Sequence, residues 1–257
     1  MRFFLLLSYC GARYGGWQIQ KNSDSVQAEV ERALSIVLKE KISVTGAGRT
    51  DAGVNASYYV LHFDTLSPEA ENISANIYKI NAILPNDIAV FDVCQVPDGA
   101  HARFDAESRT YKYFLHTVKD PFAERSLYWP YHLDFERMNR AATLLIGKRD
   151  FSCFEKTHSG SATPICKIAA ACWSPLSEEG HHVFTITSDR FLRNMVRAIV
   201  GTLLEVGKGR REPEWIEDVL KSNDRSVAGQ SVPGEPLFLA GITYPYPLFG
   251  EREQKQQ

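Results

Sequence analysis

The sequence has no long hydrophobic run. The apolar stretch near its start, Phe3–Leu7, is five residues long, which is shorter than the ~7–15 residues of a secretory signal core. No segment approaches the ~20 apolar residues that a membrane-spanning helix needs. We therefore interpret the first residues as a buried strand, and we expect a cytoplasmic protein that does not associate with a membrane.

The sequence is also short of residues placed for metal or disulfide chemistry. Its five cysteines are an odd number and include no CxxC pair, so neither a disulfide framework nor a zinc site is indicated. Its seven histidines are scattered, and the adjacent pair His181-His182 would point to opposite faces of a strand. We expect no metal ion and no cofactor.

An excess of positive charge is missing as well. The chain has 29 Lys and Arg against 31 Asp and Glu, a formal net charge of -2. Proteins that bind RNA through its phosphates are usually basic, so an RNA partner would need basic residues clustered on one surface. With 44% hydrophobic and 23% charged residues over 257 positions, the chain is typical of a globular protein with one large or two small domains.

What the sequence does contain is a pattern of elements that occurs twice. In the first half, apolar periodicity predicts a strand, a helix, two strands, a helix and a strand over residues 2–9, 24–39, 42–45, 56–65, 69–83 and 88–96. In the second half it predicts the same order with one extra helix, over residues 109–118, 134–146, 165–173, 182–187, 191–206, 214–220 and 237–243. We therefore expect an α+β fold of two ferredoxin-like (βαββαβ) halves with antiparallel-rich sheets, residues 1–102 and 103–250, followed by a polar tail at 251–257.

The most unusual segment is a glycine-rich loop between two of the predicted strands. Residues 46–56 read Gly-Ala-Gly-Arg-Thr-Asp-Ala-Gly-Val-Asn-Ala. A dinucleotide-binding G-x-G-x-x-G motif would need glycine in place of Asp51 and a helix after the loop. A phosphate-binding P-loop would need Lys and Ser or Thr where Val54 and Asn55 stand. From the residues alone, a structural turn and a functional loop remain equal alternatives.

Several segments together resemble the TruA family of tRNA pseudouridine synthases. Gly48–Val54 is similar to the active-site signature of that family, and further similar segments follow in the family's order at residues 9–20, 101–104, 109–113, 195–201 and 237–245. The resemblance covers nearly the whole chain. It implies a pseudouridine synthase fold with the active-site cleft between its halves. It also implies a tRNA isomerase that acts on uridines 38, 39 and 40 of the anticodon stem-loop, uses no cofactor and works as a homodimer.

The resemblance assigns the reaction to three residues. Asp51 is the implied nucleophile that attacks the flipped-out uridine. Because burial alone would favour the neutral acid, an enclosed carboxylate needs a neighbouring cation to stay ionised, and Arg197 is the candidate. Tyr111 is expected to stack on the target base and to assist proton removal from its carbon 5.

Four further arginines are candidates for RNA binding. Arg49, in the glycine-rich loop, is implied by the family to hold the target base out of the stack. On the predicted helix that carries Arg197, Arg190 and Arg193 would share its face, where phosphates are the expected partners and an ordinary solvated face is the alternative. Arg103, in one of the similar segments, is the fourth candidate.

The sequence departs from the family at four positions. Cys10, Asn55, Arg149 and Pro236 stand where the family usually has Asp, His, His and Gly. None replaces a residue of the implied reaction, so these departures bear on RNA positioning and target choice. The alternatives are therefore a synthase with an altered target uridine and an RNA-binding homologue that has lost catalysis. A nucleotide-binding enzyme that uses the glycine-rich loop is a third.

Overall fold

The chain folds into two compact units. The computed structural model describes residues 1–157 and 163–249. Unit 1 comprises Met1–Glu107 together with Leu239–Gln257, and unit 2 comprises Ser108–Phe238. The predicted tail at 251–257 lies outside the described residues.

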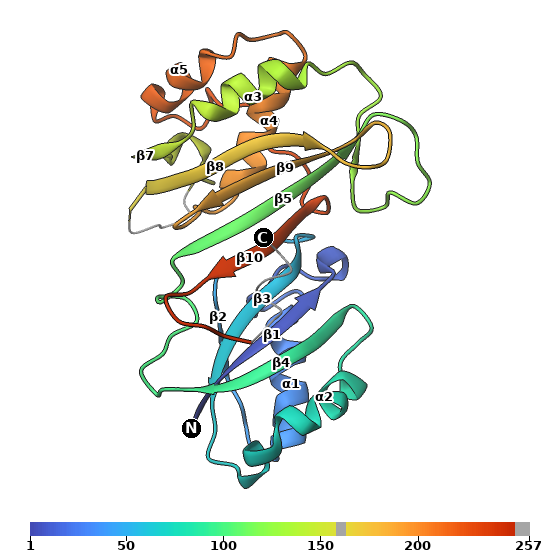
Figure 1. Cartoon of the computed structure of the whole chain (residues 1–257), viewed down its shortest axis with the longest axis vertical. Helices are drawn as coiled ribbons and strands as arrows, with labels where there is room; N and C mark the ends of the chain where they lie inside the picture. The colour runs from blue at the N-terminus through green and yellow to red at the C-terminus, as the bar shows by residue number, and fades with distance from the viewer. Residues whose placement is uncertain (158–162, 250–257) are drawn as a thin grey trace. The chain divides into compact units, whose positions relative to one another are not determined.

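Unit 1 is a sheet of the first strands of the chain, completed by the last one. Its elements are β1 (Arg2–Tyr9), α1 (Val26–Leu38), β2 (Val44–Gly46), β3 (Asn55–Asp64), α2 (Ile77–Ile83), β4 (Ile88–Val96) and, from Leu239 onward, β10 (Leu237–Thr243), with short 3-10 turns at Gly11–Arg13, Pro68–Asn72 and Ser74–Asn76. The strand order is β4-β1-β3-β10, with β2 paired to the same strand β3. β1 runs antiparallel to both of its neighbours, as Figure 1 shows.

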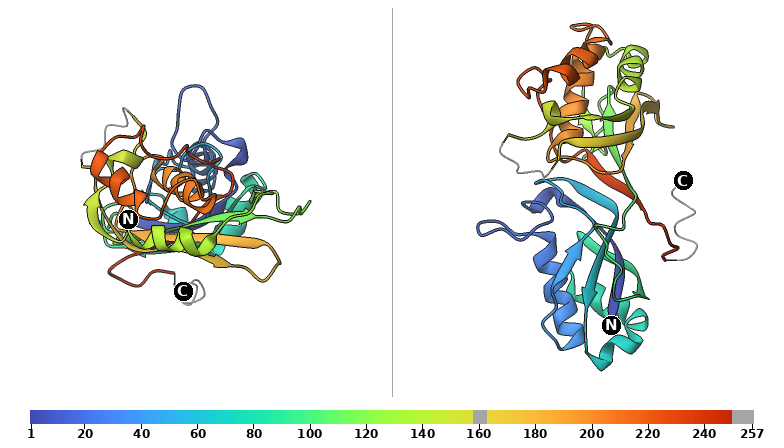
Figure 2. Two further views of the ribbon diagram at one scale, coloured as in Figure 1. Left: turned by 90° about the horizontal axis from the view of Figure 1, so that it is seen from above. Right: turned by 90° about the vertical axis from the view of Figure 1, so that its left-hand side faces the viewer.

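The central strand β1 is buried on both faces. Phe4, Leu5 and Leu7 are completely buried, so the strand reads as a continuous apolar run instead of an alternating one. Helix α1 lies alongside the sheet of unit 1 (Figure 2, right), and it buries Val30 and Leu34. The apolar run near the start of the sequence is thus a core strand, as the sequence predicted.

The segment after β10 belongs to unit 1, although the sequence assigned residues 103–250 to one half. The N–H of Glu107 donates to the carbonyl oxygen of Thr243 at 2.9 Å. The ring of Tyr244 packs edge-on against Phe4, with ring centroids 5.6 Å apart. These contacts pack Thr243 and Tyr244 against the first unit, which the order of elements along the sequence does not reveal.

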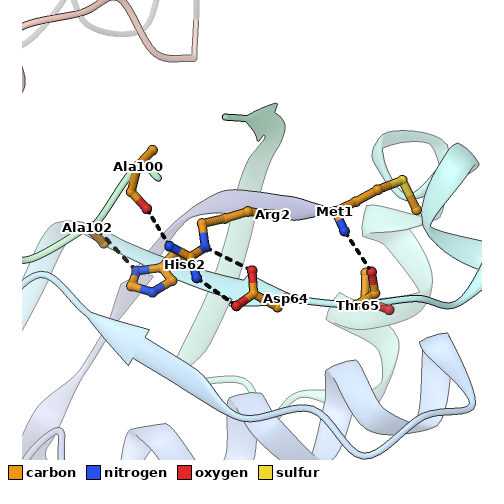
Figure 3. A network of polar contacts seen from close by, with 7 residues as sticks. All are labelled: Met1, Arg2, His62, Asp64, Thr65, Ala100 and Ala102. Atoms are coloured by element: carbon orange, nitrogen blue, oxygen red, sulfur yellow. Dashed lines mark hydrogen bonds and ion pairs between the residues drawn. The ribbon is translucent and has the colours of Figure 1, made fainter. Parts of the chain in front are cut away.

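A polar network ties the ends of β1 and β3 to the connection that follows β4 (Figure 3). The guanidinium of Arg2 donates to both carboxylate oxygens of Asp64, at 2.8 and 2.7 Å, and to the carbonyl oxygen of Ala100 at 2.9 Å. The N–H of Ala102 donates to Nδ1 of His62 at 3.1 Å. Burial, with a smaller contribution from the nearby positive charges, lowers the pKa of His62 to about 4. His62 is therefore a neutral acceptor at physiological pH.

Unit 2 is an antiparallel sheet with helices packed on it. Its elements are β5 (Ser108–His116), β6 (Leu127–Tyr128), α3 (Phe135–Thr143), β7 (Gly147–Asp150), β8 (Ile165–Pro175), β9 (His181–Ser188), α4 (Met195–Gly207) and α5 (Trp215–Ser222), with a 3-10 turn at Ser152–Phe154. The strand order is β5-β9-β8-β7, and the two-residue strand β6 pairs in parallel with β5. Helix α3 packs against both α4 and β8, and α3, α4 and α5 lie close together in Figure 1.

The fold is thus mixed α/β with a mostly antiparallel sheet. The helix predicted from residue 134 is confirmed as α3, and Asp134 caps it, since its carboxylate accepts the N–H of Arg137 at 2.9 Å. Helix α4 lies in the core of unit 2, where Ile199, Leu203 and Val206 are completely buried. Over residues 1–157 and 163–249, no helix is long and apolar enough to cross a membrane.

Candidate active site

The glycine-rich loop connects β2 to β3 and carries Asp51 on a tight turn. The N–H of Val54 donates to the carbonyl oxygen of Asp51 at 3.2 Å. Gly53, the third residue of this turn, has a φ of +78°, a conformation that side chains rarely adopt. Asp51 is partly exposed and Arg49 is exposed, whereas Thr50 between them is buried. The turn therefore places the carboxylate of Asp51 at the surface of unit 1, while the backbone of the turn is anchored at the buried Thr50.

The segment that follows β1 holds this loop in place through its backbone. The N–H of Trp17 donates to the carbonyl oxygen of Thr50 at 3.3 Å, and the N–H of Gly53 donates to that of Tyr14 at 3.4 Å. At Gly16, a Cβ atom would lie 2.3 Å from the carbonyl oxygen of Thr50 and 3.3 Å from that of Asp51. Only glycine permits this close approach, so the position of Asp51 depends on a segment far from it in sequence.

Two of the departures from the family pattern lie beside this loop. Asn55 is 1% exposed, and its side-chain oxygen accepts the N–H of Gly11 at 2.9 Å. Cys10 is partly exposed with a free thiol, and its N–H donates to the carbonyl oxygen of Asp87 at 2.8 Å. Asn55 thus serves the local structure, joining the start of β3 to the turn after β1.

The other two departures lie in unit 2. The guanidinium of Arg149 pairs with the carboxylate of Glu217 at 2.9 Å. The carbonyl oxygen of Pro236 accepts the N–H of Phe114 at 3.1 Å. Both residues are therefore engaged in contacts within their own unit.

Tyr111 lies on β5 with its ring turned into unit 2. It is 9% exposed, and its ring meets that of Phe191 edge-on, with centroids 5.1 Å apart. Side chains alternate along this part of the strand, since Tyr111, Tyr113 and Leu115 are all buried. Phe191 is an aromatic neighbour that sequence reasoning treated only as part of a helix.

Arg197 lies in the first turn of α4. Its Nε atom donates to the carbonyl oxygen of Val232 at 2.7 Å, which fixes the direction of the side chain. Burial raises the pKa of the Tyr113 hydroxyl well above its usual range, and the positive charge of Arg197 opposes that shift. The guanidinium thus acts electrostatically on the interior of unit 2.

The prediction that Arg190 and Arg193 share a helix face with Arg197 is wrong. Helix α4 begins at Met195, because its N-cap residue Asn194 is in the left-handed conformation with a φ of 67°. Arg190 and Arg193 therefore lie on the non-helical segment before the helix. Arg193 is exposed, so it stays a candidate for contact with phosphates even though the periodic argument for it fails.

Arg103 is exposed on the connection between β4 and β5. Its guanidinium lies 5.9 Å from the ring centroid of Phe104, which is itself 76% exposed. The turn that carries both residues is held by His101, whose Nδ1 accepts their two N–H groups at 3.1 and 3.2 Å. Arg103 and Phe104 are therefore displayed by an ordered turn.

The candidate residues divide between the two units. Unit 1 holds Arg49, Asp51 and Arg103, and unit 2 holds the remaining four, Tyr111, Arg190, Arg193 and Arg197. The pairing of Asp51 with Arg197 therefore stays a prediction. Within the described residues, no group of three His, Cys, Asp or Glu side chains is placed to hold a metal ion.

Sequence reasoning missed the aromatic residues behind the loop. Tyr9, Trp17 and Tyr59 form a buried cluster in which the Trp17 and Tyr59 rings stack with centroids 4.1 Å apart. The signal that could have revealed them is the Gly16-Trp17 pair, in the segment at residues 9–20 that is similar to the family's. There an aromatic residue directly follows the glycine that the loop requires.

Comparison with known proteins finds close relatives over nearly the whole chain. A family model described as tRNA pseudouridine synthase matches residues 141–245. Curated relatives named tRNA pseudouridine synthase A include one from Porphyromonas gingivalis, 48% identical over 96% of this chain and 99% of the relative. Another, from Bacteroides thetaiotaomicron, is 49% identical over 99% of this chain and 94% of the relative. At this identity over nearly full length, the chain belongs to the tRNA pseudouridine synthase A family, whose members are isomerases that convert uridine to pseudouridine in tRNA.

Proposed function

We propose that the chain isomerises uridines 38, 39 and 40 in the anticodon stem-loop of tRNA, with Asp51 as the nucleophile. The observation that carries this proposal is the placement of Asp51 on a turn whose backbone is bonded on both sides, at Thr50 and at Gly53. A group that attacks a base extruded from its helix must be held in a productive geometry, because misplacement by about 1 Å can cost ~10²-fold in rate.

The reaction requires one carboxylate and no redox step. The glycosidic bond of the uridine is broken, the uracil is rejoined to the sugar through its carbon 5, and the proton on that carbon is lost. Asp51 is suited to attack either the sugar or the uracil ring, or to act as a base in an elimination through a glycal. All three routes use the same carboxylate in its ionised form.

The proposed supporting residues act on the charge and on the base. Arg197 is the cation that keeps Asp51 ionised. Tyr111 presents its ring to the target base, with Phe191 bracing it at 5.1 Å. Arg49 is exposed beside the nucleophile, where it can occupy the space that the extruded base leaves in the RNA.

We extend the proposal to the binding partners of the chain and to the fold of each of its halves. The partners are the anticodon stem-loop of tRNA and a second copy of the chain. We also propose that each half is a ferredoxin-like unit. In unit 1, the order β4-β1-β3, with β2 on the same strand β3, supports this proposal.

The decisive experiment replaces Asp51 by asparagine, which keeps the size of the side chain and removes its charge. We expect Asp51→Asn to fold and to bind tRNA as the wild type does, but to lower turnover roughly 10³-fold or more. Release of tritium from tRNA containing 5-tritiated uridine measures the turnover.

The matched control is Asp98→Asn, which removes an exposed carboxylate from the same unit and should leave turnover unchanged. Appreciable tritium release by Asp51→Asn would exclude Asp51 as the nucleophile. Mapping pseudouridines in tRNA from a deletion strain tests the target. Losses at positions other than 38, 39 and 40 would indicate altered specificity.

A further inference from the structure

Two tyrosine hydroxyl groups are attached to the loop just before Asp51. Tyr59, on β3, donates its hydroxyl hydrogen to the carbonyl oxygen of Gly48. Tyr9, at the end of β1, shares a hydrogen bond of 2.9 Å with the side-chain hydroxyl of Thr50. The loop is thus held by side chains of two adjacent strands of the sheet, in addition to its backbone contacts.

The rings that carry these hydroxyl groups cannot move independently. Tyr9, Trp17 and Tyr59 are 4%, 3% and 0% exposed. Their ring centroids lie 4.1 to 6.1 Å apart in all three pairings. A close-packed aromatic cluster of this kind keeps its side chains in single rotamers. The hydroxyl oxygen of each tyrosine is therefore held in one position.

The two loop residues that these hydroxyl groups hold, Gly48 and Thr50, lie on either side of Arg49, and Thr50 immediately precedes the nucleophile. Gly48 is held through its carbonyl oxygen, and Thr50 is held through its side chain and, by Trp17, through its own carbonyl oxygen. The backbone that leads into Asp51 is therefore constrained at two of the three preceding residues.

We propose that Tyr59 and Tyr9 are positioning residues, whose hydroxyl groups set the location of the Asp51 carboxylate for attack on the uridine. This inference rests on the proposed function. A core role would require only the aromatic rings, for which phenylalanine would suffice. A buried hydroxyl group costs free energy unless it is hydrogen-bonded, and here both bonds are made to the loop.

The test removes each hydroxyl group and keeps each ring. We expect Tyr59→Phe and Tyr9→Phe each to lower kcat for tRNA about tenfold, and the double variant to lower it further. KM should stay within about twofold of the wild type, because the RNA-contacting surface is unchanged. Hydrogen exchange of the amides at residues 49–54 should become faster in both variants.

Tyr244→Phe is the matched control. The hydroxyl group of Tyr244 also donates to a backbone carbonyl oxygen in unit 1, that of Ala102, at 2.6 Å. This variant should leave both kcat and the exchange of residues 49–54 unchanged.

The outcomes separate this inference from the proposed function. An unchanged kcat in the double variant of an active enzyme would overturn the inference and leave the function standing. An equal loss of kcat in Tyr244→Phe would overturn it as well. A wild type that forms no pseudouridine would refute the function. The exchange rates would then still decide whether the hydroxyl groups hold the loop.

Discussion

Asn55 stands where the family usually has His. The surroundings of Asn55 limit how this difference can affect the choice of target uridine. Asn55 is buried, and its side-chain oxygen accepts the N–H of Gly11. A side chain in this position is not available to read a nucleotide directly. Its influence on target choice would therefore act through the placement of the loop.

At Tyr111, the structure allows the ring and the hydroxyl group to be tested separately. We expect Tyr111→Leu to raise the dissociation constant for tRNA about tenfold, because stacking on a base contributes ~1–3 kcal/mol. Tyr111→Phe should bind as the wild type does, since it keeps both the stacking face and the edge-on contact with Phe191. Filter binding with an unmodified transcript measures both variants.

The control for this series is Tyr78→Leu, which removes a tyrosine ring that is 67% exposed on α2. Its dissociation constant should match that of the wild type. If Tyr111→Leu also bound tRNA normally, Tyr111 would be a core residue and not a platform for the base.

The loop of the candidate site stands out in the sequence itself, whereas Tyr111 and Arg197 were assigned through the family resemblance. Asp51 and Arg49 lie in a recognisable loop. Tyr9 and Tyr59 are distant from each other in the chain, and they meet because β1 and β3 pair in a particular register, with Leu7 opposite Tyr59. Long-range register depends on the packing of the whole unit, so a local pattern cannot supply it.

At the scale of elements, the long apolar segments were predictable and the short or irregular ones were not. β1 and β4 have the predicted bounds. β6 and β7, of two and four residues, are too short to show alternation. The helix predicted over 69–83 is interrupted by 3-10 turns and becomes helical only at Ile77.

The caps explain the remaining differences at helix ends. Helix α1 is capped by Ser25, whose side chain accepts the N–H of Ala28, so the helix begins at Val26 and not at residue 24 as predicted. Helix α4 starts late, because Asn194 adopts the left-handed conformation. Asparagine tolerates that conformation better than most residues, yet periodicity alone gives no sign that it does so here.

His62 makes the stability of unit 1 dependent on pH. This neutral histidine joins β3 to the connection after β4. The pKa of His62 is lowered to about 4 in the folded chain, against about 6.5 in an unfolded one. Between these values the unfolded chain binds more protons, so stability is lost as the pH falls. From pH 7 to pH 5, we expect His62 to account for a loss of about 2 kcal/mol in the free energy of unfolding.

Urea unfolding at several pH values measures this contribution by difference. His62→Gln should show a smaller loss of stability than the wild type between pH 7 and pH 5. His132→Gln, which removes an exposed histidine, should follow the wild type. Identical pH dependence in the wild type and His62→Gln would show that His62 does not titrate as described.

For the whole molecule, the net charge of -2 means that affinity for RNA depends on a few local cations. Each phosphate contact contributes about 0.7–0.9 to the slope of log affinity against log salt concentration. We expect Arg103→Gln and Arg193→Gln each to reduce that slope by nearly one unit. Titrations of tRNA binding at several salt concentrations measure the slope.

Arg32 provides the comparison for the salt series. It is exposed on α1 and paired with Glu29 at 2.7 Å, so Arg32→Gln should leave the slope unchanged. An unaltered slope in Arg103→Gln or Arg193→Gln would remove that residue from the list of phosphate contacts.

The division of the molecule into two units was only partly visible in the sequence. The repeated order of elements pointed to two halves, and a boundary near residue 102 lies close to the start of unit 2 at Ser108. The return of residues 239–249 to unit 1 depends on tertiary contacts, such as that of Tyr244 with Phe4. Contacts between the ends of a chain leave no periodic signal.

The late position of β10 in the chain has a consequence for synthesis on the ribosome. β10 pairs with β3 in the sheet of unit 1, yet the whole of Ser108–Phe238 must be translated before most of β10 emerges. At roughly 5–20 residues per second, this delay is on the order of ten seconds. During that interval the edge of β3 that pairs with β10 lacks this neighbour. Because an unpaired strand edge can pair with another chain, nascent unit 1 is exposed to mispairing until β10 is made.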